Sequence, residues 1–233
     1  IIKIKIMINS KNFLKKNLNL KAIKIKVKKL LFLSANLFFK NGEISKKNND
    51  LLIKKEKFFH ILNIIKIAKI LFLAQKIIFI MAKNKKKILF VSTNNSTSKF
   101  LVNNFEDFIS KNCFYLTSRW MGGFITNWKN FRNKFLTLKT LKETKKKLSK
   151  KEQAAYNLKI EKFEKLFKGI KNLDGLPDLI IFLSISNKNI AISECRKFAI
   201  PTIGLSKIFN NSEKFDITIP TNIQSFSTIK YII

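Results

Sequence analysis

The residues best suited to contact a ligand lie in one stretch, Thr117–Lys129, which reads TSRWMGGFITNWK. This stretch holds both tryptophans of the chain and its only pair of adjacent glycines. Adjacent glycines accept positive φ angles, so the main chain can turn sharply and approach a partner closely. Arg119, Asn127 and Lys129 add donors that suit phosphate or sugar oxygens. The pattern predicts a tight turn that faces a nucleic acid, with a purely structural turn as the alternative.

The side chains within this stretch allow two interpretations. In the structural one, Gly122 and Gly123 make the turn and Trp120 packs into a hydrophobic core. In the binding one, the turn brings cations to an RNA backbone, and Trp128 stacks on a base. We expect both tryptophans to pack in the core, which leaves the polar side chains for binding.

The charge of the chain indicates a polyanionic partner. Its 233 residues include 47 Lys and Arg against 14 Asp and Glu, which gives a formal net charge of +33. Such a surplus points to nucleic acid or to an anionic membrane surface. Lysine, asparagine, isoleucine and phenylalanine, which A- and T-rich codons encode, are all abundant. The composition therefore also indicates an organellar genome, and codon bias is the alternative explanation for part of the lysine excess.

The side chains that usually carry catalysis or bind metals are sparse. His60 is the only histidine, and Cys113 and Cys195 are too few and too isolated for a disulfide framework or a zinc site. Because both cysteines have apolar neighbours, we expect buried, reduced thiols. Asp178 and Asp216 lie near expected strand ends, where turn and capping roles explain them. We expect no metal, no cofactor and no small-molecule substrate.

From residue 58 onward the chain alternates short apolar runs with amphipathic segments. The expected strands are Phe58–Asn63, Lys87–Val91, Cys113–Tyr115, Leu179–Leu183, Ala199–Leu205 and Phe215–Pro220. The expected helices are Ile64–Ala82, Lys99–Ser110, Asn189–Phe198 and one from about Asn222 to the end. Continuous apolar runs are typical of parallel strands that are covered on both faces. The repeated strand–helix units predict an α/β fold with a parallel sheet flanked by helices.

The helix expected at Ile64–Ala82 is apolar enough to raise the question of a membrane span. Its lysines fall within an arc of about 100° at helical spacing. They are Lys66, Lys69 and Lys76 inside the segment, with Lys83 directly after it. A charge near the bilayer centre costs about 2.5–3.5 kcal/mol. We therefore expect an amphipathic helix that packs on the core and does not span a membrane.

A protruding helical hairpin is expected as an insertion at about residues 131–171. Apolar residues in its second half follow the 4-3-4-3 spacing of a coiled-coil seam. They are Tyr156, Ile160, Phe163, Phe167 and Ile170. The sequence Ser149–Glu152 is a capping box, which marks the start of the second helix. The two helices would be antiparallel, with lysines clustered near their tip.

Residues 1–57 are expected to form a basic N-terminal extension and linker, and residues 58–233 the α/β domain. Lys24, Lys26 and Lys28 alternate with apolar residues, so an extended segment would have one apolar and one basic face. Such a segment can order as a strand against RNA. These three lysines are therefore candidate RNA contacts.

A hydroxyl-rich loop, Ser92–Ser98, follows the strand expected at Lys87–Val91. Because a helix comes next, the loop lies where helix N-terminal amides can meet an anion. It contains no glycine, which excludes a nucleotide-binding P-loop. Asn94 is a candidate RNA contact, with simple capping of the helix as the alternative.

The stretch around the two glycines resembles the signature of the small-subunit ribosomal protein two family, in its bacterial and organellar form. The shared pattern is Arg-Trp-Met-Gly-Gly-x-x-Thr-Asn-Trp-Lys, and further landmarks follow in the family's order over roughly Phe59–Ile233. These landmarks are Lys87–Thr93, Gly175–Asp178, Asn189–Glu194, Ile200–Pro201 and Ile219–Pro220. At two places this chain departs from the family pattern in a way that removes negative charge. Ser184–Ser186 replaces an acidic stretch, and Ser206–Ile208 replaces Asp-Thr-Asn.

The resemblance implies a flavodoxin-like sheet with the hairpin emerging from it, bound to small-subunit rRNA and to neighbouring small-subunit proteins. The RNA contacts that it implies are Arg119, Asn127, Lys129 and Arg132. The structural signature residues are Trp120, Gly122, Gly123, Thr126 and Trp128. We therefore expect a non-catalytic constituent of the small ribosomal subunit.

The expected location is the mitochondrial matrix, in the mitochondrial ribosome. The codon bias favours it, and the first residues lack the arginines and serines of a cleavable transit peptide, which fits a gene in the organelle. Two alternatives remain open. One is an α/β nucleotide-binding enzyme, which the missing nucleotide motifs and the lone histidine disfavour. The other is a basic protein associated with a membrane surface.

Overall fold

A five-stranded parallel sheet forms the centre of the fold. The structure is a computed structural model, and it describes residues 27–31, 33, 37–39, 51–108, 112–117, 119–133, 157, 160–161, 167–184, 188–206, 215–222 and 226–232. The strands are β4 (Ile88–Ser92), β5 (Cys113–Leu116), β6 (Leu179–Ser184), β7 (Thr202–Ser206) and β8 (Ile217–Pro220). Their order is β5-β4-β6-β7-β8, which numbered along the chain is the flavodoxin-like order 2-1-3-4-5. The expected α/β class is confirmed.

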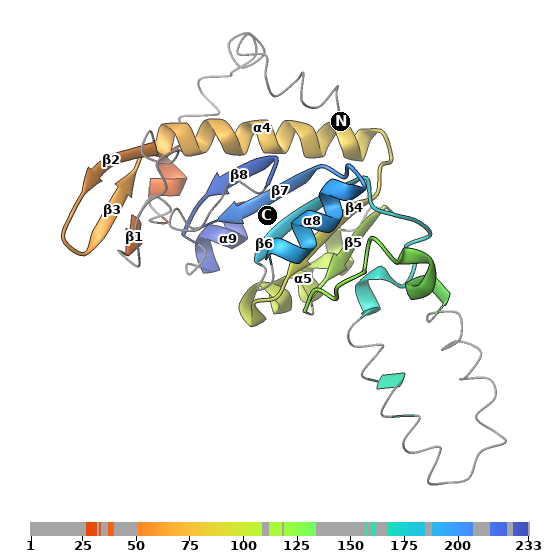
Figure 1. The fold of residues 1–233 in the computed structure, drawn as a ribbon. Helices are drawn as coiled ribbons and strands as arrows, with labels where there is room; N and C mark the ends of the chain where they lie inside the picture. Colours follow the sequence, from red (N-terminus) through yellow and green to blue (C-terminus); the bar gives the residue numbers. More distant parts are fainter. Residues whose placement is uncertain are drawn as a thin grey trace, which may run out of the picture.

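Helices cover both faces of this sheet (Figure 1). One face packs against α4 (Ile64–Lys83), α5 (Asn95–Phe108) and α9 (Phe226–Ile232). The other face packs against α8 (Lys188–Lys197) and the stretch that contains both tryptophans. The sheet therefore lies between two hydrophobic cores, and the candidate site belongs to the core on the α8 side.

Strand β6 shows why a continuous apolar run is needed at the centre of the sheet. Ile180 and Phe182 belong to the core on the α8 side, whereas Ile181 and Leu183 belong to the core on the α4 side. Successive side chains of a strand point to opposite faces. Because both faces are covered, every position of β6 up to Leu183 is buried.

Helix α4 packs on the sheet with one face. The side-chain oxygen of Asn63 caps it by accepting bonds from the backbone N–H groups of Ile65 (3.1 Å) and Lys66 (3.2 Å). Its buried residues recur at helical spacing and are Ile64, Ile67, Ala68, Leu71, Ala74 and Ile77. Lys76 is half-buried, with its ammonium 5.0 Å from the centre of the Phe72 ring, and the other lysines of the helix are exposed. The expected amphipathic helix is confirmed.

No helix in the described part of the chain is long and apolar enough to cross a membrane.

A small antiparallel sheet precedes α4, in the order β1-β3-β2. Its strands are β1 (Leu37–Phe39), β2 (Leu52–Lys55) and β3 (Phe59–Leu62). β2 lies in the range expected to be a linker, and that expectation is corrected. The reason is that β2 pairs with β3, which satisfies the backbone groups of both strands.

Residues 27–31 are helical. Leu30 is fully buried in a small core with Leu62 and Ile67. Lys28 is exposed on this helix, so the expectation of an extended strand at Lys28 is wrong. The helix differs from the expected strand because it turns Leu30 into the small core and leaves Lys28 on the opposite, exposed side.

Other bounds differ from the expected ones by a few residues. α5 begins at Asn95 rather than Lys99. Asn222 is not helical, and α9 is described over Phe226–Ile232. The hairpin expected at about 131–171 lies mostly outside the described residues, so its antiparallel coiled-coil pairing stays a prediction.

A substitution at Gly169 tests the packing of the sheet edge. Gly169 lies in the short 3-10 helix η3 (Lys168–Ile170), where a Cβ would collide with the carbonyl oxygen and the ring of Tyr115 in β5. We expect Gly169→Ala to lower the free energy of unfolding by about 1–3 kcal/mol, measured by urea denaturation. Gly122→Ala is the control, because its Cβ would meet only Ile190, at 3.9 Å. Equal stability of the two variants would contradict this packing.

Candidate nucleic-acid interface

The carboxylate of Glu194 holds residues 119–133 against α8. Glu194 is 5% exposed, and its Oε1 accepts hydrogen bonds from the backbone N–H of Gly123 (2.8 Å) and from Nε1 of Trp120 (3.4 Å). Its Oε2 accepts bonds from the backbone N–H groups of Ile125 (2.9 Å) and Thr126 (3.4 Å). A buried carboxylate is costly unless donors replace water. The loop supplies these donors, so the loop and the carboxylate depend on each other.

The backbone of this loop turns at Gly123, whose φ is +85°. The N–H of Asn127 donates to the carbonyl of Gly123 (2.7 Å), and the N–H of Phe131 donates to the carbonyl of Asn127 (3.2 Å). The turn therefore runs directly into a helical segment at 128–133. Among the described residues, the glycine with a positive φ is Gly123. The expectation of a positive φ in this turn is therefore confirmed.

The apolar side chains of the loop face the core. Trp120 is 2% exposed, and its ring meets that of the fully buried Phe124 edge to face, with centroids 5.2 Å apart. The ring centroids of Phe182 in β6 and Trp120 lie 5.9 Å apart. Those of the half-buried Trp128 and Phe124 lie 5.5 Å apart. Such aromatic pairs add to the stability that burial alone gives. The prediction that Trp120 packs in the core is confirmed, and Trp128 packs against the same cluster.

The polar side chains of the loop lie on the outside. Arg119, Asn127 and Lys129 are exposed. Arg132 is also exposed, and its Nη1 donates to the backbone carbonyl of Asp174 at 3.0 Å. The loop therefore has an apolar side covered by the core and a cationic side in contact with water. Arg132 joins this cationic side to the turn that precedes β6.

The expected RNA contacts of the loop do not converge on one point. The loop begins at the carboxyl edge of the sheet, where Ser98 Oγ donates to the carbonyl of Thr117 (3.3 Å). It ends near the amino edge, where Arg132 reaches Asp174. Between them the loop passes along α8, with Gly122 near Ile190. The loop thus runs along α8 from the carboxyl edge of the sheet to its amino edge.

Asn94 lies at the start of α5 rather than in an open loop. Its carbonyl accepts bonds from the N–H of Ser98 (2.8 Å) and from Oγ1 of Thr97 (3.1 Å). The hydroxyls of Ser92 and Thr97 are buried and bond to each other. These contacts place Asn94 directly before the first turn of α5, and its role as an RNA contact stays a prediction.

The three N-terminal lysines are not placed beside the loop by any described contact. Lys24 and Lys26 lie outside the described residues. Lys28 belongs to the helical residues 27–31, which pack with the start of α4.

Cys195 lies beneath the loop and is fully buried. Burial raises the pKa of its thiol to about 12, and the adjacent carboxylate of Glu194 adds to this rise. The thiol therefore stays protonated at neutral pH and packs as a small apolar group. Cys113 is only half-buried, because β5 is an edge strand. The expectation of buried thiols is correct for Cys195 and wrong for Cys113.

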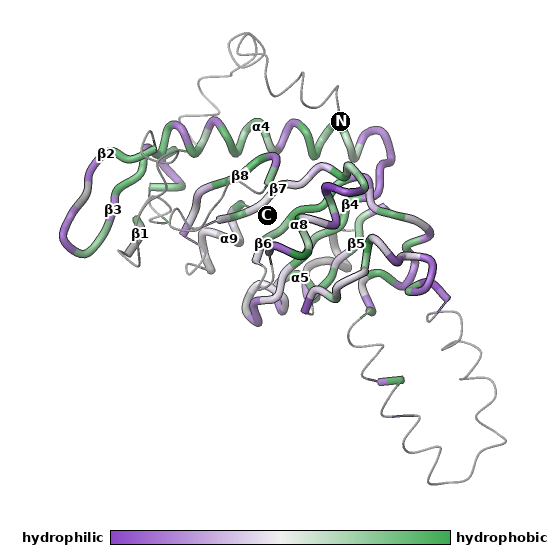
Figure 2. Tube along the Cα trace, in the orientation of Figure 1, coloured by the Kyte–Doolittle hydropathy of each residue, from purple (hydrophilic) through white to green (hydrophobic). Residues whose placement is uncertain are grey.

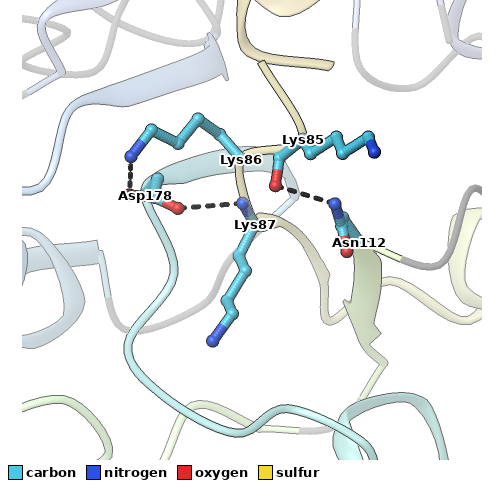
Figure 3. Close-up of polar contacts among 5 residues, drawn as sticks. All are labelled: Lys85, Lys86, Lys87, Asn112 and Asp178. Atoms are coloured by element: carbon cyan, nitrogen blue, oxygen red, sulfur yellow. Dashed lines mark hydrogen bonds and ion pairs between the residues drawn. The ribbon is translucent and has the colours of Figure 1, made fainter. Parts of the chain in front are cut away.

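The two aspartates singled out in the sequence bind groups of the fold at the amino edge of the sheet. Asp178 accepts bonds from the N–H of Lys87 (2.9 Å) and from Nζ of Lys86 (3.4 Å), as Figure 3 shows. Asp216 accepts bonds from the N–H (2.8 Å) and the hydroxyl (2.9 Å) of Thr202. Each aspartate connects the starts of two neighbouring strands. The expected turn and capping roles are confirmed.

Sequence reasoning did not identify Glu194 as the residue that organises the loop. A signal was present, because Glu194 lies on the buried face of α8 with Ala191, Ile192 and Cys195. A carboxylate among apolar neighbours requires donors from another element. Nothing in the sequence of the loop shows which carboxylate its N–H groups bind.

Comparison with known proteins gives a consistent set of relatives. The family model described as ribosomal protein S2 matches residues 33–233. The small ribosomal subunit protein uS2c of Cyanidium caldarium is 34% identical over 185 residues, covering 76% of this chain and 74% of that protein. The small ribosomal subunit protein uS2 of Pseudoalteromonas translucida is 34% identical over 168 residues, covering 70% and 68%. The protein uS2c of Guillardia theta is 33% identical over 179 residues, covering 75% of each.

Replacement of Glu194 by glutamine tests its role in the loop. The amide keeps one acceptor oxygen but turns an NH₂ group toward donors that need an acceptor. We expect Glu194→Gln to lower the free energy of unfolding by about 2–4 kcal/mol, because bonds to a charged group are lost and buried donors are left unpaired. Urea denaturation followed by tryptophan emission measures it, since both tryptophans lie in the loop.

The matched control is Lys197→Gln, an exposed position on the same helix, where we expect a change within about 0.5 kcal/mol. If Glu194→Gln were as stable as this control, the carboxylate would not hold the loop.

Proposed function

The chain belongs to the ribosomal protein S2 family, and from this premise we propose that it is a structural constituent of the small ribosomal subunit that binds small-subunit rRNA. The relatives are named as small ribosomal subunit proteins. The family match spans residues 33–233 and so includes the loop 119–133 and α8. The role is one of binding and scaffolding, without catalytic turnover.

The two-sided loop 119–133 carries the proposal. Glu194 and the aromatic core fix its inner side, so the cations on its outer side have a defined backbone spacing. Arg119 offers a planar guanidinium that can bind a phosphate with two parallel bonds, and Lys129 offers a point charge. A surface that is ordered before binding loses less entropy when RNA docks. The formal net charge of +33 adds long-range attraction to the same partner.

The remaining candidate contacts have different roles in this proposal. Arg132 uses Nη1 to bind Asp174 and keeps further N–H donors for phosphate. Asn127 is suited to sugar or base edges, because its amide both donates and accepts. Lys24 and Lys26 are further proposed phosphate contacts. Neighbouring small-subunit proteins are further partners.

We place the protein in the mitochondrial matrix, in the mitochondrial ribosome. The support is compositional, since the residues encoded by A- and T-rich codons are abundant.

The carboxyl ends of β4 and β6 lie at the point where the strand order reverses. In flavodoxin-like sheets this point, between β4 and β6 here, is where ligands bind. In this chain the N–H of Thr93 donates across it to the carbonyl of Ser184 at 2.8 Å. Ser92 beside it bonds to the buried Thr97. The bond from Thr93 continues the parallel pairing of β4 with β6. The alternative of a nucleotide-binding enzyme is disfavoured by the loop after β4, Ser92–Ser98, which contains no glycine.

The proposal predicts a steep salt dependence of RNA binding. Each phosphate that is neutralised adds about 0.7–0.9 to the slope of log K against log salt. The full chain and in vitro transcribed small-subunit rRNA should therefore give a slope of several units in a filter-binding titration. Quantitative mass spectrometry across a sucrose gradient should find the chain in the small-subunit peak. Its absence from that peak would overturn the proposal.

The loop predicts a separation between stability and assembly. Arg119→Ala and Lys129→Ala should leave the melting temperature almost unchanged, because both side chains are exposed, and should weaken incorporation into the subunit. Lys69→Ala, which removes an exposed lysine from α4, is the matched control and should assemble normally. A thermal melt beside a reconstitution assay measures both effects. If the two loop variants melted early and assembled normally once folded, the loop would be a structural turn only.

A further inference from the structure

Helix α4 ends in a turn of three consecutive lysines, Lys85–Lys87. The N–H of Lys85 donates to the carbonyl of Ala82 (3.0 Å), and the N–H of Lys86 donates to the carbonyl of Met81 (3.0 Å). This pair of bonds is the Schellman motif, in which the residue in the place of Lys85 adopts the left-handed conformation. Lys85 does so, with a φ of 53°. Glycine is the usual residue there, so a lysine is unexpected.

Helix α8 ends in the same way and provides an internal comparison. Ala199 has a φ of 55°. Its N–H donates to the carbonyl of Arg196 (3.0 Å), and the N–H of Ile200 donates to the carbonyl of Cys195 (2.9 Å). The described residues thus include two strained helix ends at the amino edge of the sheet, one with a charged side chain at Lys85 and one without a charge at Ala199.

Contacts from two other elements hold the lysine turn in place (Figure 3). The side-chain amide of Asn112 donates to the carbonyl of Lys85 at 2.7 Å. The carboxylate of Asp178 accepts the N–H of Lys87 at 2.9 Å, and the N–H of Asp178 donates to the carbonyl of Lys87 at 2.8 Å. The backbone of the turn is therefore fixed from both sides.

Two of the three ammonium groups of this turn, those of Lys85 and Lys87, have no ion pair within the described part of the chain. Lys85 and Lys86 are exposed and Lys87 is half-buried. Figure 3 shows the side chains of Lys85 and Lys87 pointing away from Asp178. In the described part of the chain, the ion pair at this turn is between Nζ of Lys86 and Oδ1 of Asp178, which lie 3.4 Å apart. Figure 2 shows the segment between α4 and β4 as hydrophilic.

The lysine turn is continuous with the cationic side of the loop 119–133. Nζ of Lys87 lies 3.3 Å from the position that a Cβ on Gly175 would take. Arg132 donates to the carbonyl of the preceding residue, Asp174. Cations from both segments therefore meet the same turn, which leads into β6. The exposed end of α8, with Arg196 and Lys197, adds charge at this edge.

We propose that the turn Lys85–Lys87 is a second, preformed contact for the RNA phosphate backbone, and that Lys85 is its main contributor. This inference rests on the proposed function and adds a site to it. A lysine in the left-handed region is less stable than a glycine there. Strained residues persist where their surroundings hold them, and they cluster at functional sites. A lysine on the outer face of α4 would give the same net charge without strain, so net charge alone does not explain Lys85.

The test compares three variants of the full chain, with in vitro transcribed small-subunit rRNA as the probe. Lys85→Gly removes both the strain and the charge. Ala199→Gly removes the same kind of strain without a change in charge, and Lys69→Gln removes an exposed charge without a change in strain. The measurements are the melting temperature and the slope of log K against log salt.

We expect Lys85→Gly to melt about 2–4 °C higher than the wild type, to bind RNA more weakly and to lower the salt slope by about 1. Ala199→Gly should melt at a higher temperature than the wild type and bind RNA normally. Lys69→Gln should change neither the melting temperature nor the salt slope. If the wild type binds and Lys85→Gly binds as well as Lys69→Gln, this inference is wrong and the proposed function stands. A wild type with no salt-dependent binding would overturn both.

Discussion

Glu194 brings a carboxylate into the interior beneath the loop 119–133, where water cannot solvate its oxygens. Four N–H groups of the loop replace that water, and three of them belong to the backbone, at Gly123, Ile125 and Thr126. Bonds to the backbone fix the path of the chain whatever the outward side chains are. The carboxylate, the positive φ of Gly123 and the burial of Trp120 therefore form one cooperative unit.

This unit explains how a chain with a formal net charge of +33 keeps a defined surface. The aromatic side of the loop contributes to the core on the α8 side, while Arg119 and Lys129 stay outside it. Because Arg119 and Lys129 add little to the core, their charged groups can contact a partner without a loss of folding stability. The amino edge repeats the same arrangement, since Asp178 and Asn112 fix the backbone of Lys85–Lys87 and leave ammonium groups exposed. In both places an internal acceptor or donor orders the backbone, and lysine or arginine side chains face outward.

The parallel sheet and α4 could be predicted from the sequence, because continuous apolar runs and a helical arc of lysines report directly on burial. Trp120 could be placed in the core for the same reason. β2 and the exposed Lys28 helix could not, since their structure depends on pairing with β3 and on the burial of Leu30. The role of Glu194 could not be predicted either, because it depends on contacts between residues about 70 positions apart along the chain. Local patterns predict elements, whereas a hydrogen bond between distant elements requires the fold.

Ultraviolet crosslinking of intact small ribosomal subunits, with the modified peptides mapped by mass spectrometry, measures most directly whether the loop held by Glu194 faces rRNA. Nucleotide adducts should occur on peptides that cover residues 119–133. Peptides from the outer face of α4, which includes the exposed Ile65 and Phe79, should carry none. Adducts on α4 with none on residues 119–133 would contradict the assignment of this loop as the RNA-facing surface.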